Sequence, residues 1–462
     1  MICTLVAGSS SLPNGAMAAN GSLTPTVGNH LPRTNRQEAQ ASTPIPAMPA
    51  LLTVNATDDI DDGSCDSTHC SLTEAINAAN VREGPDDIVF DARVFPPQGT
   101  GVIELTVGLP EIRGRDTTID ASGAGVIVDG SRLDDGANGF TIRSSGVMLR
   151  GIRLQRIPNY GVIIGDFDGI EVYNNTLDGV TVVDSGYGSS GSGRADGMWI
   201  MAICKDCRAT RNRIVNCTVE NGADDGIEVW SIAGGVVADN LIAGNRVINA
   251  AEVGIEIDVH GPGGSNDRNT VANNLVQGTK EQAGIYINPW LGGSASGNII
   301  YGNVVVDNAE YGIGIGAEGS GTKAVANRIV NNLVERHDRW GIVVGSGNGA
   351  VADGNFIIGN TIKGNSQAGE GIRIQVSSND NLVYYNNIVN NPLSARDDGN
   401  NNRWDYDSKG NYWSDYTGQD ENGDGIGDTP YPVAPNGVDN YPLMTPYTYE
   451  QRIYLPVLLR TK

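Results

Sequence analysis

A short glycine-led pattern, Gly-Ile-x-Ile, recurs through the middle of the chain. It reads GMWI, GIEV, GIEI, GIYI, GIGI, GIVV and GIRI, with the glycines at Gly197, Gly226, Gly254, Gly284, Gly312, Gly341 and Gly371. The intervals between these glycines average 29 residues, and none departs from that mean by more than one residue. Self-similarity at a fixed period of this size is typical of a solenoid.

Each period also contains a second apolar stretch that opens with an asparagine-rich turn, as in NRIVNCTV, NRIVNNLV and YYNNIVNN. No apolar pattern of helical spacing separates these stretches. The repeat therefore consists of strands and turns, which predicts an all-β fold, a parallel β-helix whose coils stack about 4.8 Å apart. The crossover rule for parallel strands predicts a right-handed solenoid.

Alternation along each strand predicts which side chains face inward. Successive strand residues point to opposite faces, and stacked coils repeat the same face. In the segment GIEIDVH, we expect Ile255, Ile257 and Val259 to fill the interior. The outward residues of that segment are Glu256, Asp258 and His260.

Acidic and aromatic residues gather in outward columns when the coils are aligned on their glycines. One column holds Trp199, Glu228, Glu256 and Tyr286. The next holds Met201, Trp230, Asp258 and Asn288. Just upstream, Asp196 stacks beside Asp225, with Asp224 and Glu252 nearby. In later coils the first column continues as Gly314, Val343 and Arg373, so the acidic and aromatic residues are confined to the earlier coils.

This acidic and aromatic face, on the coils between residues 196 and 290, is the best candidate for chemistry. Outward positions of any soluble solenoid are polar, and an acidic protein stacks some acids by chance. However, like charges in register destabilise a sheet, and exposed tryptophans do nothing for solubility. Tryptophan rings flanked by carboxylates suit sugar rings, so we expect a polysaccharide ligand. The candidate substrate-binding residues are Trp199, Trp230, Tyr286, Asn288, Trp290 and Lys280.

Two catalytic mechanisms are open. Carboxylates on adjacent coils lie about 5 Å apart, as in retaining glycosidases, while diagonal pairs reach the inverting range. Repulsion between Glu228 and Glu256 would raise one pKa, which leaves one acid protonated and the other ionised. Alternatively, Asp225, Asp258 or Glu256 would hold Ca²⁺ against a uronate while His260 or Lys280 abstracts a proton in β-elimination. The candidate catalytic residues are Glu228, Glu256, Asp225, Asp258, Asp196, Asp224 and His260.

Charge and composition exclude some partners. The formal net charge is −23, and so acidic a surface repels phosphate backbones, which excludes nucleic acid as a partner. A repeat array grows by adding coils, so 462 residues require no division of the solenoid into domains. No apolar run approaches the roughly 18 to 20 residues of a transmembrane segment. The oligomeric state is not indicated by the sequence.

The ends of the chain divide it into regions. Residues 1–50 contain a short apolar stretch, a possible cleavage site at Ala16-Met17-Ala18, and a lead-in rich in Ser, Thr and Pro. Residues 51–399 are expected to form the capped β-helix, 400–444 a carboxyl-terminal cap, and 445–462 a tail. The signal-like start predicts a secreted, periplasmic or cell-surface protein.

The cysteines agree with an oxidising compartment. Cys65 and Cys70 bracket a short turn that permits a small disulfide loop. Cys204, Cys207 and Cys217 lie together after Met201. They predict either one disulfide with a buried thiol or a metal site, and the first is favoured because no histidine lies nearby.

Residues 70 to 80, CSLTEAINAAN, predict an amphipathic helix. Ser71 with Glu74 three residues later makes a capping box. A helix here would cover the open end of the solenoid. The stretch resembles the CSLREA-type amino-terminal segment of secreted β-helix proteins, with Thr73 in place of the usual Arg. The resemblance implies a cap and an extracytoplasmic setting.

The carboxyl region, GNYWSDYTGQDENGDGIGDTPYPV and DNYPLM, resembles the end of NosD-type periplasmic β-helix proteins, a copper-binding accessory family with carbohydrate-binding and sugar-hydrolase relatives. Its spacing D-x-N-x-D-G-x-G-D also matches the first nine positions of an EF-hand loop. The expected Ca²⁺ ligands are Asp420, Asn422, Asp424, Asp428 and the carbonyl of Ile426. Tyr431 replaces the usual final Glu, so Asp415 or Asp439 would have to supply a carboxylate. Such hard oxygen ligands do not favour copper.

Three functions from different classes therefore compete. The first is an extracellular glycoside hydrolase or polysaccharide lyase that acts through the acidic and aromatic face. The second is a non-catalytic carbohydrate-binding or adhesion solenoid. The third is an accessory periplasmic metal-delivery protein.

Overall fold

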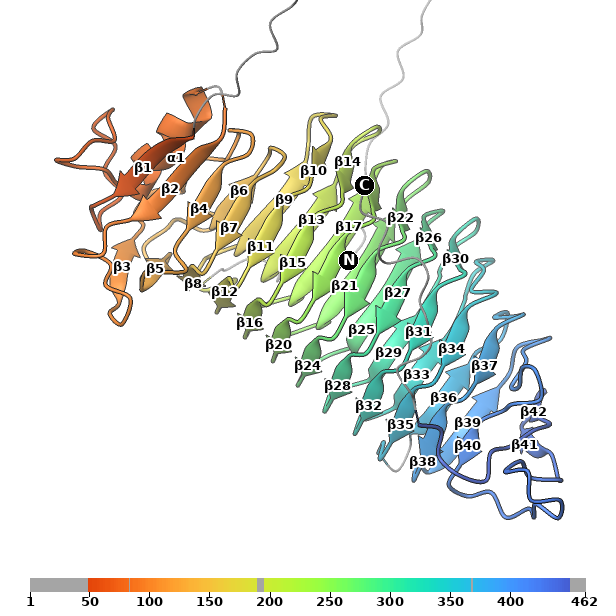
Figure 1. Cartoon of the computed structure of the whole chain (residues 1–462). Helices are drawn as coiled ribbons and strands as arrows, with labels where there is room; N and C mark the ends of the chain where they lie inside the picture. The colour runs from red at the N-terminus through yellow and green to blue at the C-terminus, as the bar shows by residue number, and fades with distance from the viewer. Residues whose placement is uncertain (1–48, 83, 189–194, 367–368, 449–462) are drawn as a thin grey trace, which may run out of the picture. The chain divides into compact units, whose positions relative to one another are not determined.

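The computed structural model describes residues 49–82, 84–188, 195–366 and 369–448. The possible signal, nearly all of the lead-in, and most of the tail lie outside the described residues. The described chain forms a right-handed parallel β-solenoid, which confirms the predicted fold (Figure 1). Each full coil contributes one strand to each of the long sheets.

Two sheets of 12 strands and one of ten run the length of the solenoid, beside a shorter sheet of six. The first 12-stranded sheet contains β1 (Ala50–Val54), β2 (Asp86–Phe90), β4 (Thr118–Asp120), β7 (Met148–Arg150), β11 (Thr176–Asp178), β15 (Arg213–Val215), β19 (Leu241–Ala243), β23 (Thr270–Ala272), β27 (Ile299–Tyr301), β31 (Arg328–Val330), β34 (Phe356–Ile358) and β37 (Leu382–Tyr384). The second contains β3 (Gly101–Glu104), β5 (Val126–Asp129), β8 (Arg153–Gln155), β12 (Thr181–Val183), β16 (Thr218–Glu220), β20 (Arg246–Ile248), β24 (Leu275–Gln277), β28 (Val304–Val306), β32 (Leu333–Glu335), β35 (Thr361–Lys363), β38 (Asn387–Val389) and β40 (Tyr412–Trp413).

The ten-stranded sheet carries the glycine-led strands. It contains β6 (Phe140–Ile142), β9 (Val162–Asp166), β13 (Met198–Ala202), β17 (Ile227–Ile232), β21 (Ile255–His260), β25 (Ala283–Trp290), β29 (Tyr311–Ile315), β33 (Trp340–Val344), β36 (Glu370–Ile374) and β39 (Leu393–Asp397). The six-stranded sheet contains β10 (Val172–Tyr173), β14 (Arg208–Thr210), β18 (Val236–Ala238), β22 (Ser265–Asp267), β26 (Ser294–Ser296) and β30 (Lys323–Val325). β41 (Tyr431–Val433) and β42 (Gly437–Asp439) form an antiparallel hairpin.

The repeated glycine is required by a close approach between neighbouring coils. A Cβ atom on Gly226 would lie 2.2 Å from Cγ1 of Val247 and 2.5 Å from the carbonyl oxygen of Gly254. Both distances are shorter than any side chain tolerates, so only glycine fits where the chain enters this strand. The same crowding recurs from coil to coil, which accounts for the period seen in the sequence.

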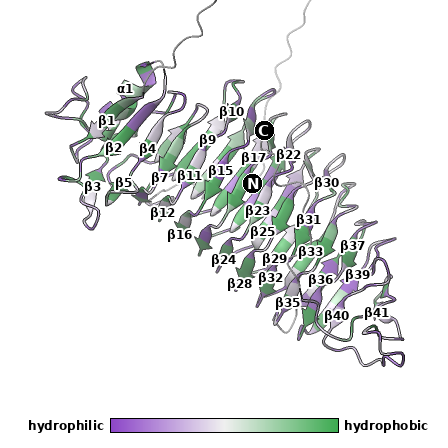
Figure 2. Cartoon of the chain, viewed as in Figure 1, coloured by the Kyte–Doolittle hydropathy of each residue, from purple (hydrophilic) through white to green (hydrophobic). Residues whose placement is uncertain are grey.

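Aliphatic side chains fill the solenoid as predicted. Ile255, Ile257 and Val259 are fully buried, and their equivalents in the neighbouring coils join the same continuous core. Figure 2 shows apolar residues recurring along the strands of successive coils. Burial of these stacked side chains is the main stabilising contribution to the fold.

Buried asparagines form hydrogen-bonded ladders at the turns. Asn303 illustrates the pattern: its Nδ2 donates to the carbonyl of Val271 and to Oδ1 of Asn332, each at 2.9 Å. Its Oδ1 accepts from the backbone N–H of Asn274 at 2.9 Å. One ladder contains Asn175, Asn212, Asn240, Asn269, Asn298, Asn327, Asn355 and Asn381. The other contains Asn245, Asn274, Asn303, Asn332, Asn360, Asn386 and Asn411. These ladders explain the asparagine-rich turns of the sequence.

The predicted cap helix is α1 (Leu72–Val81). Its capping box is formed, because the Ser71 hydroxyl accepts from the N–H of Glu74 and the Glu74 carboxylate accepts from the N–H of Ser71. Cys65 and Cys70 are joined in a disulfide. Cys204 and Cys207 form a second disulfide, and Cys217 is a buried free thiol, so the favoured interpretation of these three cysteines agrees with the structure.

Candidate active site

The predicted outward columns lie on the ten-stranded sheet, in the register that the glycines indicated. Glu228 of β17 pairs with Trp199 of β13 on one side and with Glu256 of β21 on the other. The pairing continues to Tyr286 of β25. In the second column the partners are Met201, Trp230, Asp258 and Asn288. Strand pairing therefore brings residues about 29 positions apart in the sequence side by side.

These columns surround a cavity of about 330 Å³, which we call the acidic cavity. Its walls come from β13, β17, β21 and β25, from the turns that precede them, from Tyr160 ahead of β9 and from Glu318 after β29. The lining residues are Tyr160, Asp196, Trp199, Asp224, Asp225, Glu228, Trp230, Glu252, Glu256, Asp258, His260, Gln282, Tyr286, Asn288, Trp290 and Glu318. Every predicted catalytic residue lies in this lining.

Carboxyl groups dominate the acidic cavity. Eight of the lining residues are Asp or Glu, His260 is the only imidazole among them, and none is Lys or Arg. The carboxylate oxygens approach to within 4.8 Å of one another in three overlapping groups. These groups are Asp196, Asp225 and Glu228; Asp224, Asp225 and Glu252; and Glu228, Glu256 and Asp258.

Burial distinguishes this cavity from an ordinary polar surface. Glu228 and Glu256 face outward from the sheet as predicted, yet each is only 8% exposed, because the surrounding side chains cover them. Asp196, Asp225 and Asp258 are also buried. Carboxylates are costly to bury while charged, so the cavity must hold protons or positive charge close to these groups.

The pKa values of the acids are shifted accordingly. Burial, together with the hydrogen bond to Glu252 and the charge of Asp225, raises the pKa of Asp224 to about 9. Burial and the charge of Asp258 raise the pKa of Glu256 to about 8. Burial, followed by neighbouring carboxylates, raises the pKa of both Asp225 and Glu228 well above the usual range. At neutral pH the cluster therefore retains protons.

Hydrogen bonds make the two stacked glutamates different. Oε1 of Glu256 accepts from Nδ2 of Asn288 at 3.0 Å, and Asp225 shares a further hydrogen bond with Glu256. Both bonds lower the pKa of Glu256, against the effect of burial. The main pKa contributions at Glu228 are burial and four neighbouring carboxylates, all of which raise its pKa. Glu256 thus keeps its charge more readily than Glu228.

Backbone groups fix the acids at the cavity's edge. Oδ1 of Asp225 accepts from the N–H of Val253 at 2.8 Å, and Oδ1 of Asp196 accepts from the N–H of Asp225 at 3.2 Å. Each aspartate is therefore tied to the coil that follows it. Such bonds hold the carboxyl groups in place without a ligand.

A column of five rings forms one wall of the acidic cavity. The rings are those of Tyr160, Trp199, Trp230, His260 and Trp290, with successive centroids 4.4, 5.1, 5.9 and 5.5 Å apart. His260 Nε2 also lies 3.4 Å from Oδ2 of Asp258. The wall thus combines stacked aromatic surface with a single basic group.

The expectation that all three tryptophans are exposed is wrong. Trp199 is 8% exposed and packs with Ile163 and Met201, Trp230 is half-buried, and only Trp290 is exposed, at 38%. The diagonal stacking of rings on neighbouring coils causes this burial. Nε1 of Trp199 and Nε1 of Trp230 are both buried with no hydrogen-bond acceptor among the described residues. Two indole donors beside the cavity are therefore buried without an acceptor among the described residues.

The lining of the acidic cavity differs from the predicted set at a few positions. Lys280 is exposed and does not line the acidic cavity, although Gln282, two residues further on, does. Tyr160, Gln282 and Glu318 line the cavity but were not predicted. Tyr160 precedes Gly161, which opens the segment GVII, so an alignment extended by one coil would have found it.

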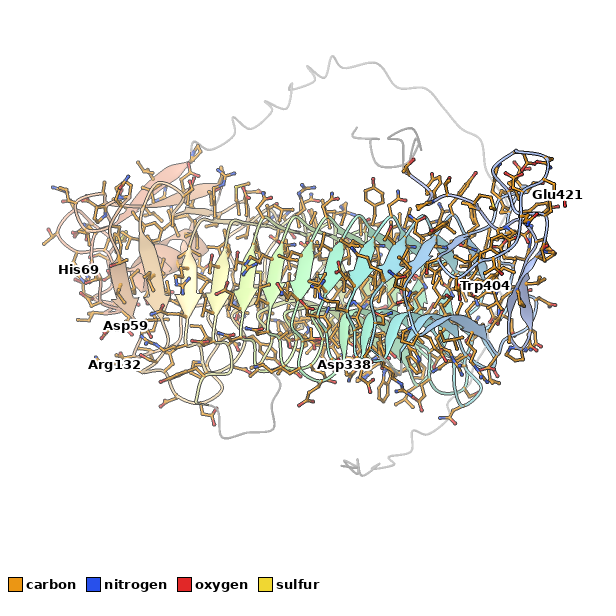
Figure 3. All side chains as sticks on the ribbon, turned by 90° about the horizontal axis from the view of Figure 1, so that it is seen from below. Asp59, His69, Arg132, Asp338, Trp404 and Glu421 are labelled. Carbon is orange, nitrogen blue, oxygen red and sulfur yellow. A yellow bond between two sulfur atoms is a disulfide. The ribbon has the colours of Figure 1, made fainter. Side chains whose placement is uncertain are left out.

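The carboxyl-terminal loop places its predicted calcium ligands differently from a closed metal site. Oδ1 of Asp420 accepts from the N–H groups of Gly423 and Asp424, and Oδ2 accepts from Gly425. Within the described residues, no three carboxylates of this loop converge to within 4.8 Å. The loop lies at the C-terminal end of the solenoid, where Figure 3 labels Glu421 on the exposed side and Trp404 below it.

The two suggested extra carboxylates are engaged elsewhere. Oδ2 of Asp439 accepts from the N–H of Asn411 at 2.7 Å and from Nε1 of Trp413 at 2.8 Å. Oδ2 of Asp415 accepts from the hydroxyl of Tyr431 at 2.9 Å. Neither group is directed into the loop by these contacts.

Fold and site together define a parallel β-helix protein with an acidic, aromatic-walled cavity on its ten-stranded sheet. The family model described as "Periplasmic copper-binding protein (NosD)" matches residues 104–418, and the chain belongs to this family. Family membership confirms the predicted secreted or periplasmic location. No helix in the described part of the chain has the length and apolar character of a membrane span.

Two curated relatives share part of the chain. A probable ABC transporter binding protein NosD of Pseudomonas aeruginosa is 31% identical over 143 residues, which is 29% of this chain and 31% of the relative. A protein of the same description from Stutzerimonas stutzeri is 39% identical over 75 residues, 16% of this chain and 17% of the relative. The match thus spans a third or less of each relative's length.

Solved structures with a similar fold include the periplasmic alginate epimerase AlgG, with a TM-score of 0.43, 14% identity and coverage of 68% of both chains. The GH136 lacto-N-biosidase of Eubacterium ramulus has a TM-score of 0.41 and 12% identity, covering 76% of this chain and 67% of that one. At these scores and identities the likeness carries no information on activity.

The described residues do not fit a copper site. Copper favours imidazole and sulfur ligands, whereas carboxylates suit hard cations. Four groups of three described residues could hold a metal, and three of them contain only carboxylates. The fourth, formed by Asp62, His69 and Glu74, offers a single imidazole. The family description and the donor chemistry of this chain therefore disagree.

Proposed function

We propose that this protein hydrolyses a glycosidic bond of a polysaccharide in its acidic cavity. The observation that carries the proposal is the pair Glu228 and Glu256, stacked in register and buried beside a wall of aromatic rings. Glycoside hydrolysis needs one protonated and one ionised carboxyl group on either side of the bond. Aromatic rings supply the surface against which sugar rings pack.

The roles follow from the electrostatics. Glu228 retains its proton more strongly and acts as the general acid that protonates the leaving oxygen. Glu256, which accepts the hydrogen bond of Asn288, loses its proton more readily than Glu228 and acts as the partner in its ionised form, which becomes the major form above its pKa of about 8. Their group of carboxylate oxygens lies within 4.8 Å, below the separation of about 6.5 to 9.5 Å found in inverting enzymes. The geometry therefore favours a retaining mechanism with Glu256 as nucleophile.

Hydrolysis is favoured over β-elimination on charge grounds. A uronate would bring its carboxylate among eight acidic side chains with no Lys or Arg in the lining to neutralise it. Lys280, one of the two bases suggested for elimination, lies outside the cavity. The substrate residue bound here is therefore a neutral or basic sugar.

A non-catalytic binding solenoid is the second candidate, and the wall of stacked rings favours it equally. Binding alone would not require carboxyl groups with raised pKa values. The raised pKa values therefore favour catalysis over binding alone. Metal delivery is the least supported function because the donor groups do not suit copper.

The test is depolymerisation of neutral and acidic polysaccharides by the full chain. New reducing ends from a neutral polymer, with no ultraviolet absorbance of an unsaturated uronate, are the expected result. Absorbance with uronate polymers would replace hydrolysis with elimination. Binding without any product would leave the binding solenoid.

We also propose that the carboxyl-terminal loop binds Ca²⁺ as a structural ion. Support comes from the D-x-N-x-D-G-x-G-D spacing and from the turn that Gly425 makes with a φ of +84°. Binding would require the carboxylates of Asp420 and Asp424 to exchange backbone N–H partners for the ion.

A further inference from the structure

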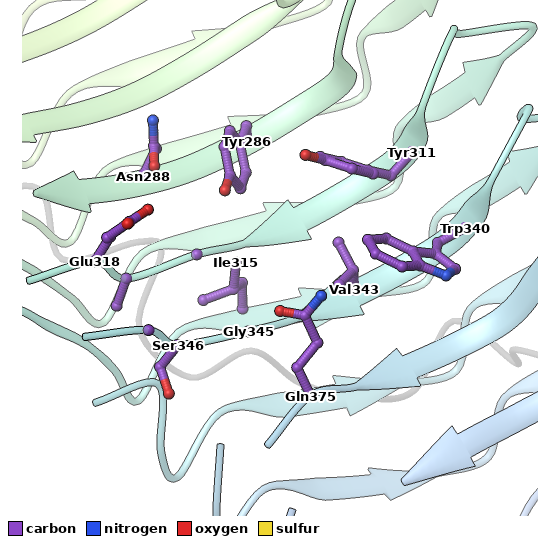
Figure 4. A pocket seen from close by; sticks show the side chains of 13 residues that line it. Tyr286, Asn288, Tyr311, Ile315, Glu318, Trp340, Val343, Gly345, Ser346 and Gln375 are labelled. Atoms are coloured by element: carbon purple, nitrogen blue, oxygen red, sulfur yellow. The ribbon is translucent and has the colours of Figure 1, made fainter. Parts of the chain in front are cut away.

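We propose that a second hollow on the same sheet binds neutral sugar residues adjoining the one held in the acidic cavity. This neutral hollow has a volume of about 200 Å³ (Figure 4). Its lining residues are Tyr286, Asn288, Tyr311, Ile315, Gly316, Ala317, Glu318, Trp340, Val343, Gly345, Ser346, Gly347 and Gln375. The identity of its occupant rests on the proposed function, while the existence of the binding surface does not.

The neutral hollow exists because glycines replace side chains on two coils. A Cβ on Gly314 would lie 2.7 Å from Cδ2 of Tyr286, and one on Gly316 would lie 2.3 Å from the Tyr286 hydroxyl oxygen. A Cβ on Gly345 would lie 2.1 Å from Oε1 of Gln375. The glycines therefore let the Tyr286 ring and the Gln375 amide lie flat over the sheet. The outward column that loses its acidic and aromatic residues at Gly314 and Val343 is therefore the floor of this binding surface.

Aromatic rings line one end of the neutral hollow. The rings of Tyr311 and Trp340 are stacked, with centroids 5.6 Å apart and planes at 19°. Tyr286 meets Tyr311 edge-on at 5.8 Å. The guanidinium of Arg339 lies 3.8 Å from the Trp340 centroid and holds that ring in position. Figure 4 shows Tyr286, Tyr311 and Trp340 on successive strands, with Val343 beside Trp340 and Gln375 below.

The polar groups of the neutral hollow are mostly uncharged. Asn288, Ser346 and Gln375 offer amide and hydroxyl groups, and Glu318, at the edge shared with the acidic cavity, is the only charged lining residue. The Ser346 hydroxyl is held by its bond to the carbonyl oxygen of Ser377 at 2.7 Å. Aromatic surface with neutral hydrogen-bonding groups matches the faces and hydroxyls of uncharged sugars, and offers nothing to a phosphate or a uronate.

The two hollows adjoin. Tyr286, Asn288 and Glu318 line both of them. The acidic cavity lies over β13 to β25, and the neutral hollow continues over β29 and β33. A linear polysaccharide lying along the solenoid axis therefore passes from one into the other. The protein would engage several residues of the chain and cleave within or near the acidic cavity.

The test is affinity electrophoresis in gels that contain one polysaccharide each: mixed-linkage β-glucan, xylan, galactomannan, alginate or polygalacturonate. Four full-length proteins are compared: Glu256→Gln as the inactive parent, and Trp340→Ala, Gln375→Ala and Tyr406→Ala made in that parent. Tyr406 is an exposed tyrosine near the C-terminal end and contacts neither hollow, so it is the matched control.

We expect at least one neutral polymer to retard the parent and the Tyr406→Ala protein equally. Trp340→Ala should weaken that retardation about tenfold through lost ring contact. Gln375→Ala removes only an amide and tests the same surface if the tryptophan variant fails to fold. Equal retardation of all four proteins would overturn the neutral hollow and leave the proposed function intact.

The two proposals fail in different ways. Suppose that Trp340→Ala loses retardation and that the wild-type protein releases no product from any polymer. This result would support the binding surface and refute hydrolysis. Retardation only by alginate or polygalacturonate would overturn the neutral occupant. Absence of retardation by every polymer would overturn both.

Discussion

Glu228 and Glu256 occupy equivalent positions on adjacent coils, and each is 8% exposed although both face away from the aliphatic core. Side chains of neighbouring columns cover them, so the pair is outside the solenoid and yet shielded from water. This combination raises both pKa values and is the basis of the proposed acid catalysis.

Glu228→Gln and Glu256→Gln should each reduce turnover by at least about a hundredfold while glycan binding is retained, because each keeps the shape of the side chain and removes proton transfer or charge. Release of reducing ends and affinity electrophoresis measure the two effects separately. Asn440→Gln, a change at an exposed amide far from the cavity, is the control. Full activity in either glutamate variant would remove that residue from the catalytic pair.

The stability of the wild type should fall as the pH rises from about 4.5 to 8. The pKa of Glu256 is raised from its usual 4.5 to about 8, so in this window the unfolded chain releases a proton that the folded chain retains. Below the window both states are protonated, and this contribution vanishes. The melting temperature of Glu256→Gln should therefore match the wild type at low pH and exceed it increasingly towards pH 8. A difference that does not change with pH would contradict the raised pKa.

Trp199→Phe should weaken glycan binding about five- to tenfold, because a smaller ring between Tyr160 and Trp230 disturbs the stacked wall against which sugar rings pack. Titration at a temperature well below the melting point measures the affinity without interference from stability. An unchanged affinity would show that the ligand does not pack against this part of the wall.

Asn303→Ala should destabilise the protein by about 2 to 4 kcal/mol, because it leaves buried partners on the neighbouring coils without their hydrogen bonds. Denaturant unfolding measures the change. Asn440→Ala removes an exposed amide that binds Asp405 and should cost less than about 1 kcal/mol. Equal effects at the two positions would mean that the ladders contribute little.

Added Ca²⁺ should raise the melting temperature, and a chelator should lower it, because an ion that binds only the folded state stabilises it by about 2.7 kcal/mol at a hundred times its dissociation constant. Asp424→Ala should abolish the response. A wild-type melting curve indifferent to both additions would refute the calcium proposal.

The sequence alone determined the fold and most of the acidic cavity. A glycine at every coil marks the close approach seen between Gly226 and Val247, and strict alternation from that glycine fixes which residues face the core. The register between neighbouring strands follows from the position of the same glycine. Glu228, Glu256 and Asp258 could therefore be assigned to their columns from the sequence. In a solenoid, contacts between neighbouring coils reduce to contacts between positions one period apart, which is why a local pattern carries this information.

Only the tertiary structure decided how deeply these groups are buried and where the cavity ends. The stacking of Trp199 on Trp230 depends on side-chain rotamers, which strand alternation does not specify. The neutral hollow depends on glycines such as Gly314. In the sequence such a glycine indicates only that no functional side chain is present, whereas in the structure it makes room for the Tyr286 ring. Burial and empty space are properties of the whole packed surface, so no single column of residues encodes them.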